Sequence, residues 1–183
     1  MVADLNDPRN IAFDSNVLTY FLDGNRGDYS MRAGDPLAEQ RIAAVRLYMY
    51  AQPYIVPTVR AEAARILDVP KLDEHRRFID FNFGEIWLHD WQQKRTDQRA
   101  TELQAYHGDA DDCRIVAEIE EHGHIWVLVT CDLRLQERLS PHARIRIETP
   151  TQCWSSFAIA SGTMPPRSPA PGHPLATETW WRW

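Results

Sequence analysis

Residues 111–132 read DDCRIVAEIEEHGHIWVLVTCD, and this stretch decides the fold class. Its first half carries apolar residues at the three- and four-residue spacing of a helix face, which predicts a helix over 110–122. Gly123 follows, in the position where glycine commonly ends a helix. The next residues, 124–132, form a strongly apolar run that predicts a buried strand ending at Asp132. A helix that leads directly into a buried strand is typical of α/β proteins.

The same alternation of strands and helices runs through most of the chain. From the apolar patterns we expect further strands at 10–14, 54–57 and 144–147. Helices are expected at 16–23, 37–50, 58–67, 71–82, 90–105 and 133–139. The polar, glycine-rich residues 24–35 predict a loop. This alternation predicts a three-layer α/β/α sandwich around a central, mostly parallel sheet.

Composition places the chain among globular proteins and excludes several other classes. At 183 residues and 44% apolar content, it suits one domain with a sizeable core. Its net charge of −6 argues against a basic surface that wraps nucleic acid non-specifically, although a local basic groove is compatible with it. The three cysteines lack metal-ligand spacing and are expected to be free thiols. No signal peptide and no apolar run of about 18 residues is visible, so we expect a cytoplasmic protein without a membrane span.

Composition changes after residue 160, which divides the chain into two parts. Residues 161–183 hold five of the twelve prolines and three of the seven tryptophans. We therefore expect a globular domain over 1–160 and an extended Pro/Trp-rich tail outside it. The aromatic end of this tail could stack on bases, but packing or protein interaction is favoured for such a segment.

Four acids are expected at one edge of the sheet. Asp14 and Asp132 each end a predicted strand, and ligands of parallel α/β sheets bind beyond the carboxyl ends of the strands. Glu62 lies near the start of the helix that follows the second strand. Asp112 precedes the apolar residues Ile115, Val116 and Ile119 by three, four and seven positions, so it lies on their buried face of the helix. Asp111 lies about 100° around the helix axis from that face. Packed carboxylates repel unless a cation lies between them, which favours a divalent-cation site.

Each acid also has a purely structural interpretation. Asp14 and Asp132 could cap the helices that follow them, because aspartate is among the best N-cap residues. Asp112 could form a capping box with Asp109. Glu62 could be a first-turn acid that the helix dipole favours. For each acid taken singly, the sequence leaves both interpretations open.

Four segments around these acids resemble the acidic motifs of the PIN-domain nucleases, the family that includes the VapC-type toxin ribonucleases. They are FDSNVLTYFL, VPTVRAEAARIL, DDCRIVAEIEEHG and VLVTCD, in the order found in the family, within residues 10–147. The resemblance implies a PIN-like fold and a Mg²⁺- or Mn²⁺-dependent endoribonuclease that hydrolyses phosphodiester bonds. As partners it implies an RNA substrate, an antitoxin or other protein, and a second copy of the chain in a homodimer.

The resemblance also implies the roles of individual residues. Carried over position by position, the catalytic and metal-binding residues would be Asp14, Glu62, Asp112 and Asp132. Asn16 and Thr130 would border the site as supporting hydrogen-bonding groups. The chain departs from the family in being longer than a small VapC-like toxin, and Asp109 and Asp111 crowd the third motif. These departures affect the toxin role and the choice of the third ligand.

Other functions fit the residues less well. A phosphohydrolase of the haloacid-dehalogenase type needs a second Asp two residues after the first, and here that position is Asn16. A phosphoacceptor receiver domain usually needs paired acids after the first strand and a late lysine, whereas the last lysine here is Lys94. The stronger alternative is a catalytically silent PIN-like scaffold that binds RNA or a protein partner.

Basic side chains near the motifs have two interpretations. They could meet phosphate oxygens of RNA, or they could be ordinary solvated helix positions. The arginines concerned are Arg60, Arg65, Arg114 and Arg134. The seven histidines show no HExxH pattern and are expected at the surface.

Overall fold

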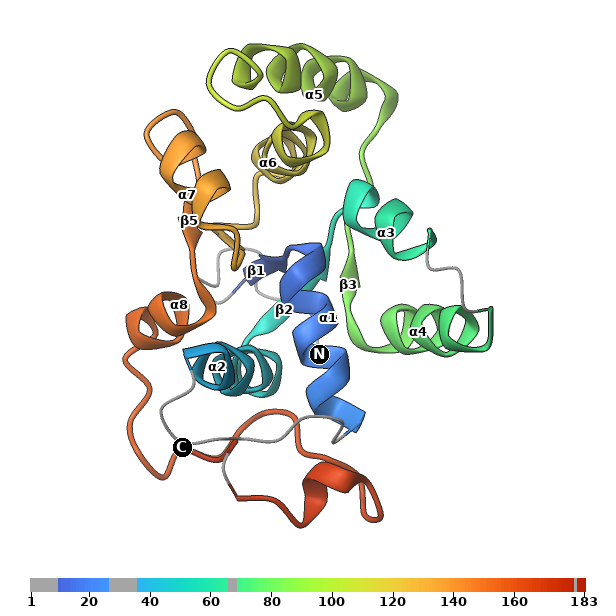
Figure 1. Ribbon diagram of the computed structural model, residues 1–183, viewed down its shortest axis with the longest axis vertical. Coiled ribbons are helices and arrows are strands. Elements are labelled where there is room, and N and C mark those ends of the chain that lie inside the picture. The colour runs from blue at the N-terminus through green and yellow to red at the C-terminus, as the bar shows by residue number, and fades with distance from the viewer. Residues whose placement is uncertain (1–9, 27–35, 66–68, 180) are drawn as a thin grey trace.

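Five parallel strands form one central sheet in the order β3-β2-β1-β4-β5 (Figure 1). The computed structural model describes residues 10–26, 36–65, 69–179 and 181–183. The strands are β1 Asn10–Phe13, β2 Gln52–Ile55, β3 Gly84–Glu85, β4 Val127–Val129 and β5 Arg146–Glu148. The strand order reverses at β1, which pairs with β2 on one side and with β4 on the other. The carboxyl ends of β1 and β4 therefore flank the point where open α/β sheets bind ligands.

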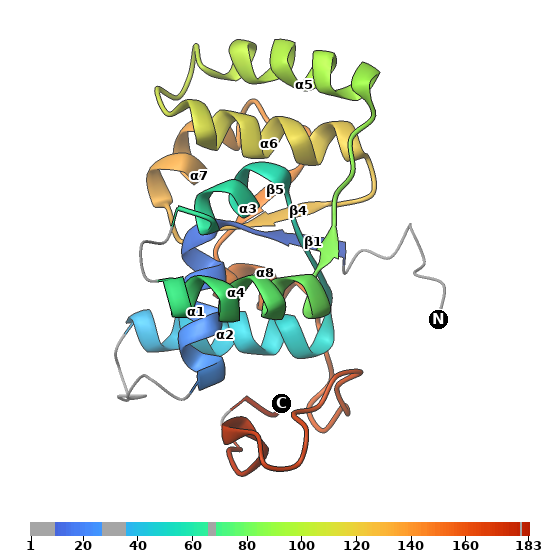
Figure 2. The same ribbon diagram turned by 90° about the vertical axis from the view of Figure 1, so that its right-hand side faces the viewer.

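Helices cover both faces of this sheet, which confirms the predicted three-layer sandwich (Figure 2). On one face lie α3 Pro57–Ala63 and α6 Ala110–His122, with α5 Asp90–Leu103 packed on the outer side of α6. On the other face lie α1 Ser15–Arg26, α2 Pro36–Tyr50 and α8 Pro150–Ser156. The remaining helices are α4 Val69–Asn82, α7 Leu133–Leu139 and the short 3₁₀ turn η1 Pro174–Ala176.

The two central strands are buried on both faces, as a parallel sheet between two helical layers requires. Ile11, Ala12 and Phe13 of β1 are fully buried, and so are the three residues of β4. The predicted helix over 110–122 is α6, and Gly123 ends it in the left-handed region with a φ of 78°. Residues 111–132 thus form the helix and the strand that their pattern predicts.

Some predicted boundaries differ from the structure. The strand expected over 124–132 pairs only at Val127–Val129, because the chain turns toward α7 after Val129. The helix expected over 58–67 ends at Ala63. Patterns of apolar residues do not reveal these ends, since tertiary contacts decide where a buried segment leaves its element.

Helix α8 is absent from the sequence-based prediction. Thr149 and Gln152 form the capping box that begins it, but it contains only seven residues and shows little apolar periodicity. Within the loop expected at 24–35, the first three residues continue α1, and 27–35 lie outside the described residues. No helix in the described part of the chain combines the length and apolarity that a membrane span requires.

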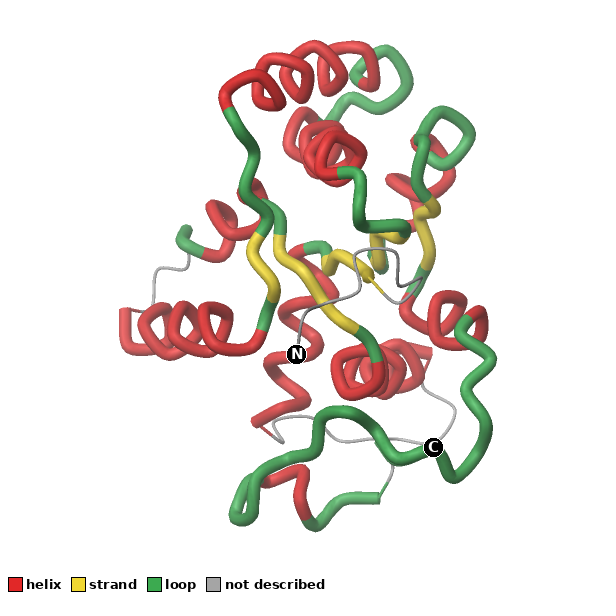
Figure 3. Tube along the Cα trace, turned by 180° about the vertical axis from the view of Figure 1, so that it is seen from behind, coloured by secondary structure: helices red, strands yellow, loops and turns green. Residues whose placement is uncertain are grey.

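The C-terminal tail folds back on the domain, in contrast to the extended segment expected (Figure 3). The Arg167 guanidinium donates to the carbonyl oxygens of Tyr48 and Ala51 at the end of α2. Leu175 and Trp181 are buried within the hydrophobic core. The described tail residues are therefore part of the packed structure, and the division at residue 160 stays a prediction based on composition.

Candidate active site

Asp14 lies at the carboxyl end of β1 and is only 5% exposed. Its Oδ1 accepts a hydrogen bond from the Ser15 amide (2.7 Å), and its Oδ2 accepts from Asn16 Nδ2 (2.7 Å) and Thr130 Oγ1 (2.6 Å). A carboxylate offers about four acceptor positions, so Oδ1 retains capacity for a further ligand. Burial raises the pKa of Asp14, although the hydrogen bonds from Thr130 and Ser15 oppose this rise.

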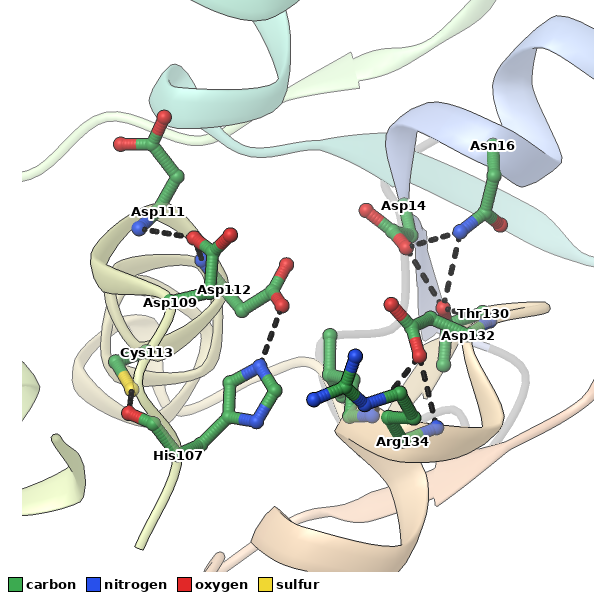
Figure 4. Close-up of polar contacts among 11 residues, drawn as sticks. Asp14, Asn16, His107, Asp109, Asp111, Asp112, Cys113, Thr130, Asp132 and Arg134 are labelled. Carbon is green, nitrogen blue, oxygen red and sulfur yellow. Dashed lines mark hydrogen bonds and ion pairs between the residues drawn. The ribbon is translucent and has the colours of Figure 1, made fainter. Parts of the chain in front are cut away.

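Asn16 and Thr130 join the ends of the two central strands around this carboxylate. Asn16 Oδ1 accepts from the Cys131 amide (2.9 Å), and Thr130 Oγ1 accepts from the Asp132 amide (3.0 Å). Because each side chain also donates to Asp14, the three residues form one closed network (Figure 4). This network fixes the orientation of the Asp14 carboxylate.

Asp132 is the N-cap of α7, as its structural interpretation predicts. Its Oδ1 accepts from the amides of Arg134 (2.8 Å) and Leu135 (3.0 Å). Its Oδ2 accepts no hydrogen bond from any described residue. Capping therefore uses one oxygen of this carboxylate and leaves the other for a ligand.

The three crowded acids of the third motif have three different partners. Asp109 is the N-cap of α6 and accepts from the amides of Asp111 (2.9 Å) and Asp112 (3.3 Å). Asp111 forms an ion pair with Arg65 (3.3 Å) and is 43% exposed at its side chain. Asp112 Oδ2 lies 2.7 Å from His107 Nε2, and its side chain is 20% exposed. Asp112 is thus the more inward of the two acids in the first turn of α6, as its helical position predicts.

His107 corrects the expectation that the histidines are surface groups. Its side chain is 11% exposed, and it holds Asp112 in place beside the start of α6. Burial raises the pKa of Asp112, the hydrogen bond from His107 lowers it, and the charges of Asp109 and Asp132 raise it. No sequence signal identifies this contact, because the loop between α5 and α6 sets where His107 lies.

Glu62 comes from α3 and meets the first turn of α1. The Ser15 hydroxyl donates to a Glu62 carboxylate oxygen, which places this acid beside the residue that follows Asp14. Burial raises the pKa of Glu62, the Ser15 hydrogen bond lowers it, and the charges of Asp14 and Asp111 raise it. Ser15 is a further residue of the site that sequence reasoning missed.

The four predicted acids therefore approach one another from separate elements. The charges of Asp112 and Asp132 both add to the rise in the pKa of Asp14 that burial causes. Figure 4 shows the Asp112 side chain on the side of α6 that faces Asp14 and Asp132. Among the described residues, however, no group of three or more His, Cys, Asp or Glu side chains is close enough to hold a metal ion. The oxygen donors suit Mg²⁺ or Mn²⁺ chemically, whereas their spacing is wider than that of a formed ligand set.

The four arginines near the motifs differ in their partners. Arg60 pairs with Asp80 and with Glu85 (3.1 Å). Arg114 pairs with Asp97 (2.8 Å) and Glu118 (3.2 Å), and Arg65 pairs with Asp111. Arg134 is exposed in the first turn of α7, next to Asp132, and forms no ion pair with any described residue (Figure 4). It is the arginine of the four that is positioned to meet an added anion.

Comparison with known proteins finds a likeness among solved structures. No protein-family model and no curated protein matches the chain. The chain is similar to the solved structure described as "Crystal Structure of FitAcB from Neisseria gonorrhoeae", with a TM-score of 0.46 and 15% sequence identity. The likeness covers 76% of this chain and 97% of that chain. The functional interpretation therefore depends on the four motifs and on the geometry of the acids.

Proposed function

We propose that the protein is a divalent-metal-dependent endoribonuclease of the PIN type. The observation that carries this proposal is Asp14, a buried carboxyl group at the switch point of the sheet that Asp112 and Asp132 approach from two other elements. Burying a carboxylate beside like charges is unfavourable unless a cation or another partner compensates it. A cation between these acids would remove that cost. The four sequence motifs support the same function.

In this proposal Asp14 is the central ligand, and Glu62 and Asp112 complete the site directly or through water. Asp132 holds a second cation or orients the attacking water through its free Oδ2. Bound Mg²⁺ or Mn²⁺ would lower the pKa of a bound water and stabilise charge on the leaving oxygen. Asn16 and Thr130 keep the Asp14 carboxylate oriented, and His107 does the same for Asp112.

The proposed substrate is RNA, and Arg134 is its phosphate contact. An exposed guanidinium can bind phosphate oxygens in a bidentate manner, and Arg134 lies next to Asp132 without a competing acid from the described residues. The resemblance to VapC-type proteins extends the proposal to a toxin of a toxin–antitoxin pair, with an antitoxin or other protein partner and a homodimer.

A catalytically silent PIN-like scaffold is the second candidate. The observation that favours it is the spacing of the acids, which is too wide for a formed metal site among the described residues. In this case the protein would bind RNA or a protein partner at the same edge of the sheet without cutting.

Cleavage of a mixed pool of end-labelled structured and single-stranded RNAs, with Mn²⁺ present or chelated, separates the two candidates. We expect Mn²⁺-dependent cutting by the wild type that is lost in Asp14→Asn and Asp112→Asn. The matched control is Asp97→Asn, which removes an exposed acid on α5. Cutting that survives in Asp112→Asn and is lost in Asp111→Asn would move the third ligand to Asp111. RNA binding without cutting would instead support the scaffold.

A further inference from the structure

Glu118 is a buried carboxylate on α6 that lies outside the four acidic motifs. It is only 1% exposed, although it does not lie on the same face of α6 as the apolar residues of that helix. The reason is that α6 is covered by α3 and α5 as well as by the sheet, so it is buried on more than one side. A buried carboxylate needs partners to offset its desolvation.

The partners of Glu118 come mainly from the start of α3. Oε1 accepts from the Thr58 hydroxyl (2.8 Å), and Oε2 accepts from the Thr58 amide (3.1 Å). Arg114, one turn earlier on α6, donates to Oε1 (3.2 Å). The carboxylate is therefore satisfied on both oxygens, and two of its three hydrogen bonds cross to α3.

These bonds replace a cap that α3 lacks. Val56 stands at the N-cap and has no side chain that can accept a hydrogen bond, and Pro57 has no amide hydrogen. The Thr58 amide is consequently the first free donor of the helix, and Glu118 accepts it across a sequence separation of 60 residues. A helix of seven residues with no local cap depends strongly on such an external acceptor.

The two residues of this contact lie on the same helices as two of the proposed metal ligands. Thr58 lies four residues before Glu62 on α3, and Glu118 lies six residues after Asp112 on α6. The contact therefore ties the helix that carries Glu62 to the helix that carries Asp112. The hydrogen bond that the Glu62 side chain accepts from Ser15 reaches α1 and does not fix α3 against α6.

We infer that Glu118 is a positioning residue, which through Thr58 sets the position of Glu62 relative to Asp112 and thereby favours cation binding. This inference rests on the proposed function. A positioning role differs from a general contribution to stability because it acts on one distance, the distance between α3 and α6. Loss of the contact should affect cation affinity more than a comparable loss elsewhere on α6.

Glu120 provides a matched control on the same helix. Its side chain is fully buried and pairs with Arg99 (2.7 Å), which ties α6 to α5 and not to α3. Glu118→Gln and Glu120→Gln thus make the same chemical change at two buried ion pairs of one helix. Thr58→Val removes the hydroxyl from the other side of the contact, and Thr58→Ser retains it.

The test measures Mn²⁺ binding to the full chain in the absence of RNA. Electron paramagnetic resonance detects the Mn²⁺ that stays free in solution. We expect Glu118→Gln and Thr58→Val to raise the Kd for Mn²⁺ about 10-fold, the usual cost of losing an outer partner of a metal site. Glu120→Gln and Thr58→Ser should bind Mn²⁺ as the wild type does. Hydrogen exchange should show the α3 amides opening about fivefold more readily in Thr58→Val, because the hydroxyl bond that anchors α3 to Glu118 is lost while the amide bond remains.

The outcomes separate this inference from the proposed function. Unchanged Mn²⁺ affinity in Glu118→Gln and Thr58→Val, with faster exchange in α3, would overturn the inference and leave the ribonuclease proposal intact. An equal loss of affinity in Glu120→Gln would overturn it too, because the effect would then be general. Shifted Mn²⁺ affinity in a protein that cuts no RNA would support the positioning role and contradict the nuclease.

Discussion

Thr130→Val tests the hydrogen-bond network around Asp14 most directly. The substitution keeps the shape of the side chain and removes its hydroxyl, which donates to Asp14 (2.6 Å) and accepts from the Asp132 amide (3.0 Å). Thr130 is fully buried, so water cannot replace the lost group without rearrangement. The expected result is a less stable protein with a misdirected Asp14 carboxylate.

The magnitude follows from the two bonds. A hydrogen bond to a charged group contributes about 2 kcal/mol, and leaving the partly buried Asp132 amide without its acceptor costs about 1 kcal/mol. We therefore expect a loss of about 3 kcal/mol in the free energy of unfolding at pH 7. With an m-value of about 2 kcal/mol/M, the urea midpoint should fall by about 1.5 M.

The loss of unfolding free energy in Thr130→Val should also depend on pH, in a direction that follows from the pKa of Asp14. Burial raises the folded-state pKa of Asp14 above its ordinary value of 3.8, so its neutral form stabilises the fold and this stabilisation is lost as pH rises through the folded-state pKa. The hydrogen bond from Thr130 opposes that rise, so the variant should have a still higher pKa at Asp14. The difference between wild type and variant should be largest at neutral pH and shrink as the pH falls toward 3.8.

Urea unfolding followed by tryptophan fluorescence at pH 7 and pH 5 measures both quantities. The matched control is Thr96→Val, because Thr96 is equally buried and its hydroxyl has no hydrogen-bond partner among the described residues. That variant should be neutral or slightly stabilised. A loss under about 1 kcal/mol in Thr130→Val, or a loss that grows on acidification, would refute the role assigned to this hydroxyl.

Other perturbations address the substrate, the cation and the tail. Arg134→Gln should raise the KM for a short RNA about 10-fold at unchanged kcat, through the loss of a charged hydrogen bond, while Lys94→Gln on α5 should not. Mn²⁺ at about 100 times its Kd should stabilise the wild type by about 2.7 kcal/mol in urea, and Asp14→Asn should abolish this gain; an equal gain in the variant would place the cation elsewhere. Arg167→Met should destabilise the protein by about 2 kcal/mol, because it leaves carbonyl oxygens at the end of α2 without donors, whereas the exposed Arg138→Met should have little effect.

The fold was largely predictable because its signals are local. The apolar spacing of 110–122, the glycine after it and the short buried strands each depend on a few neighbouring residues. Strand ends and the helix α8 were less predictable, since the packing of distant elements decides where regular structure stops or where a weakly amphipathic segment becomes helical.

The arrangement of the candidate site was predictable only in part, for the same physical reason. Acids that end strands, such as Asp14 and Asp132, follow from the topology of a parallel sheet. The residues that hold such acids in place come from elsewhere in the chain: Ser15 meets Glu62 across 47 positions, and Thr58 meets Glu118 across 60. Contacts of this kind leave no periodic pattern in one sequence.

The buried position of Trp181 has a consequence for synthesis on the ribosome. Its indole Nε1 donates to the Leu175 carbonyl (2.8 Å), and both side chains belong to the same core as strand β1. The nascent chain therefore cannot complete its core until Trp181 has left the exit tunnel, about 170 residues after β1 was made. During that interval the apolar surface that the tail later covers is accessible to chaperones and proteases. The protein therefore acquires its final stability only after this part of the tail has been released.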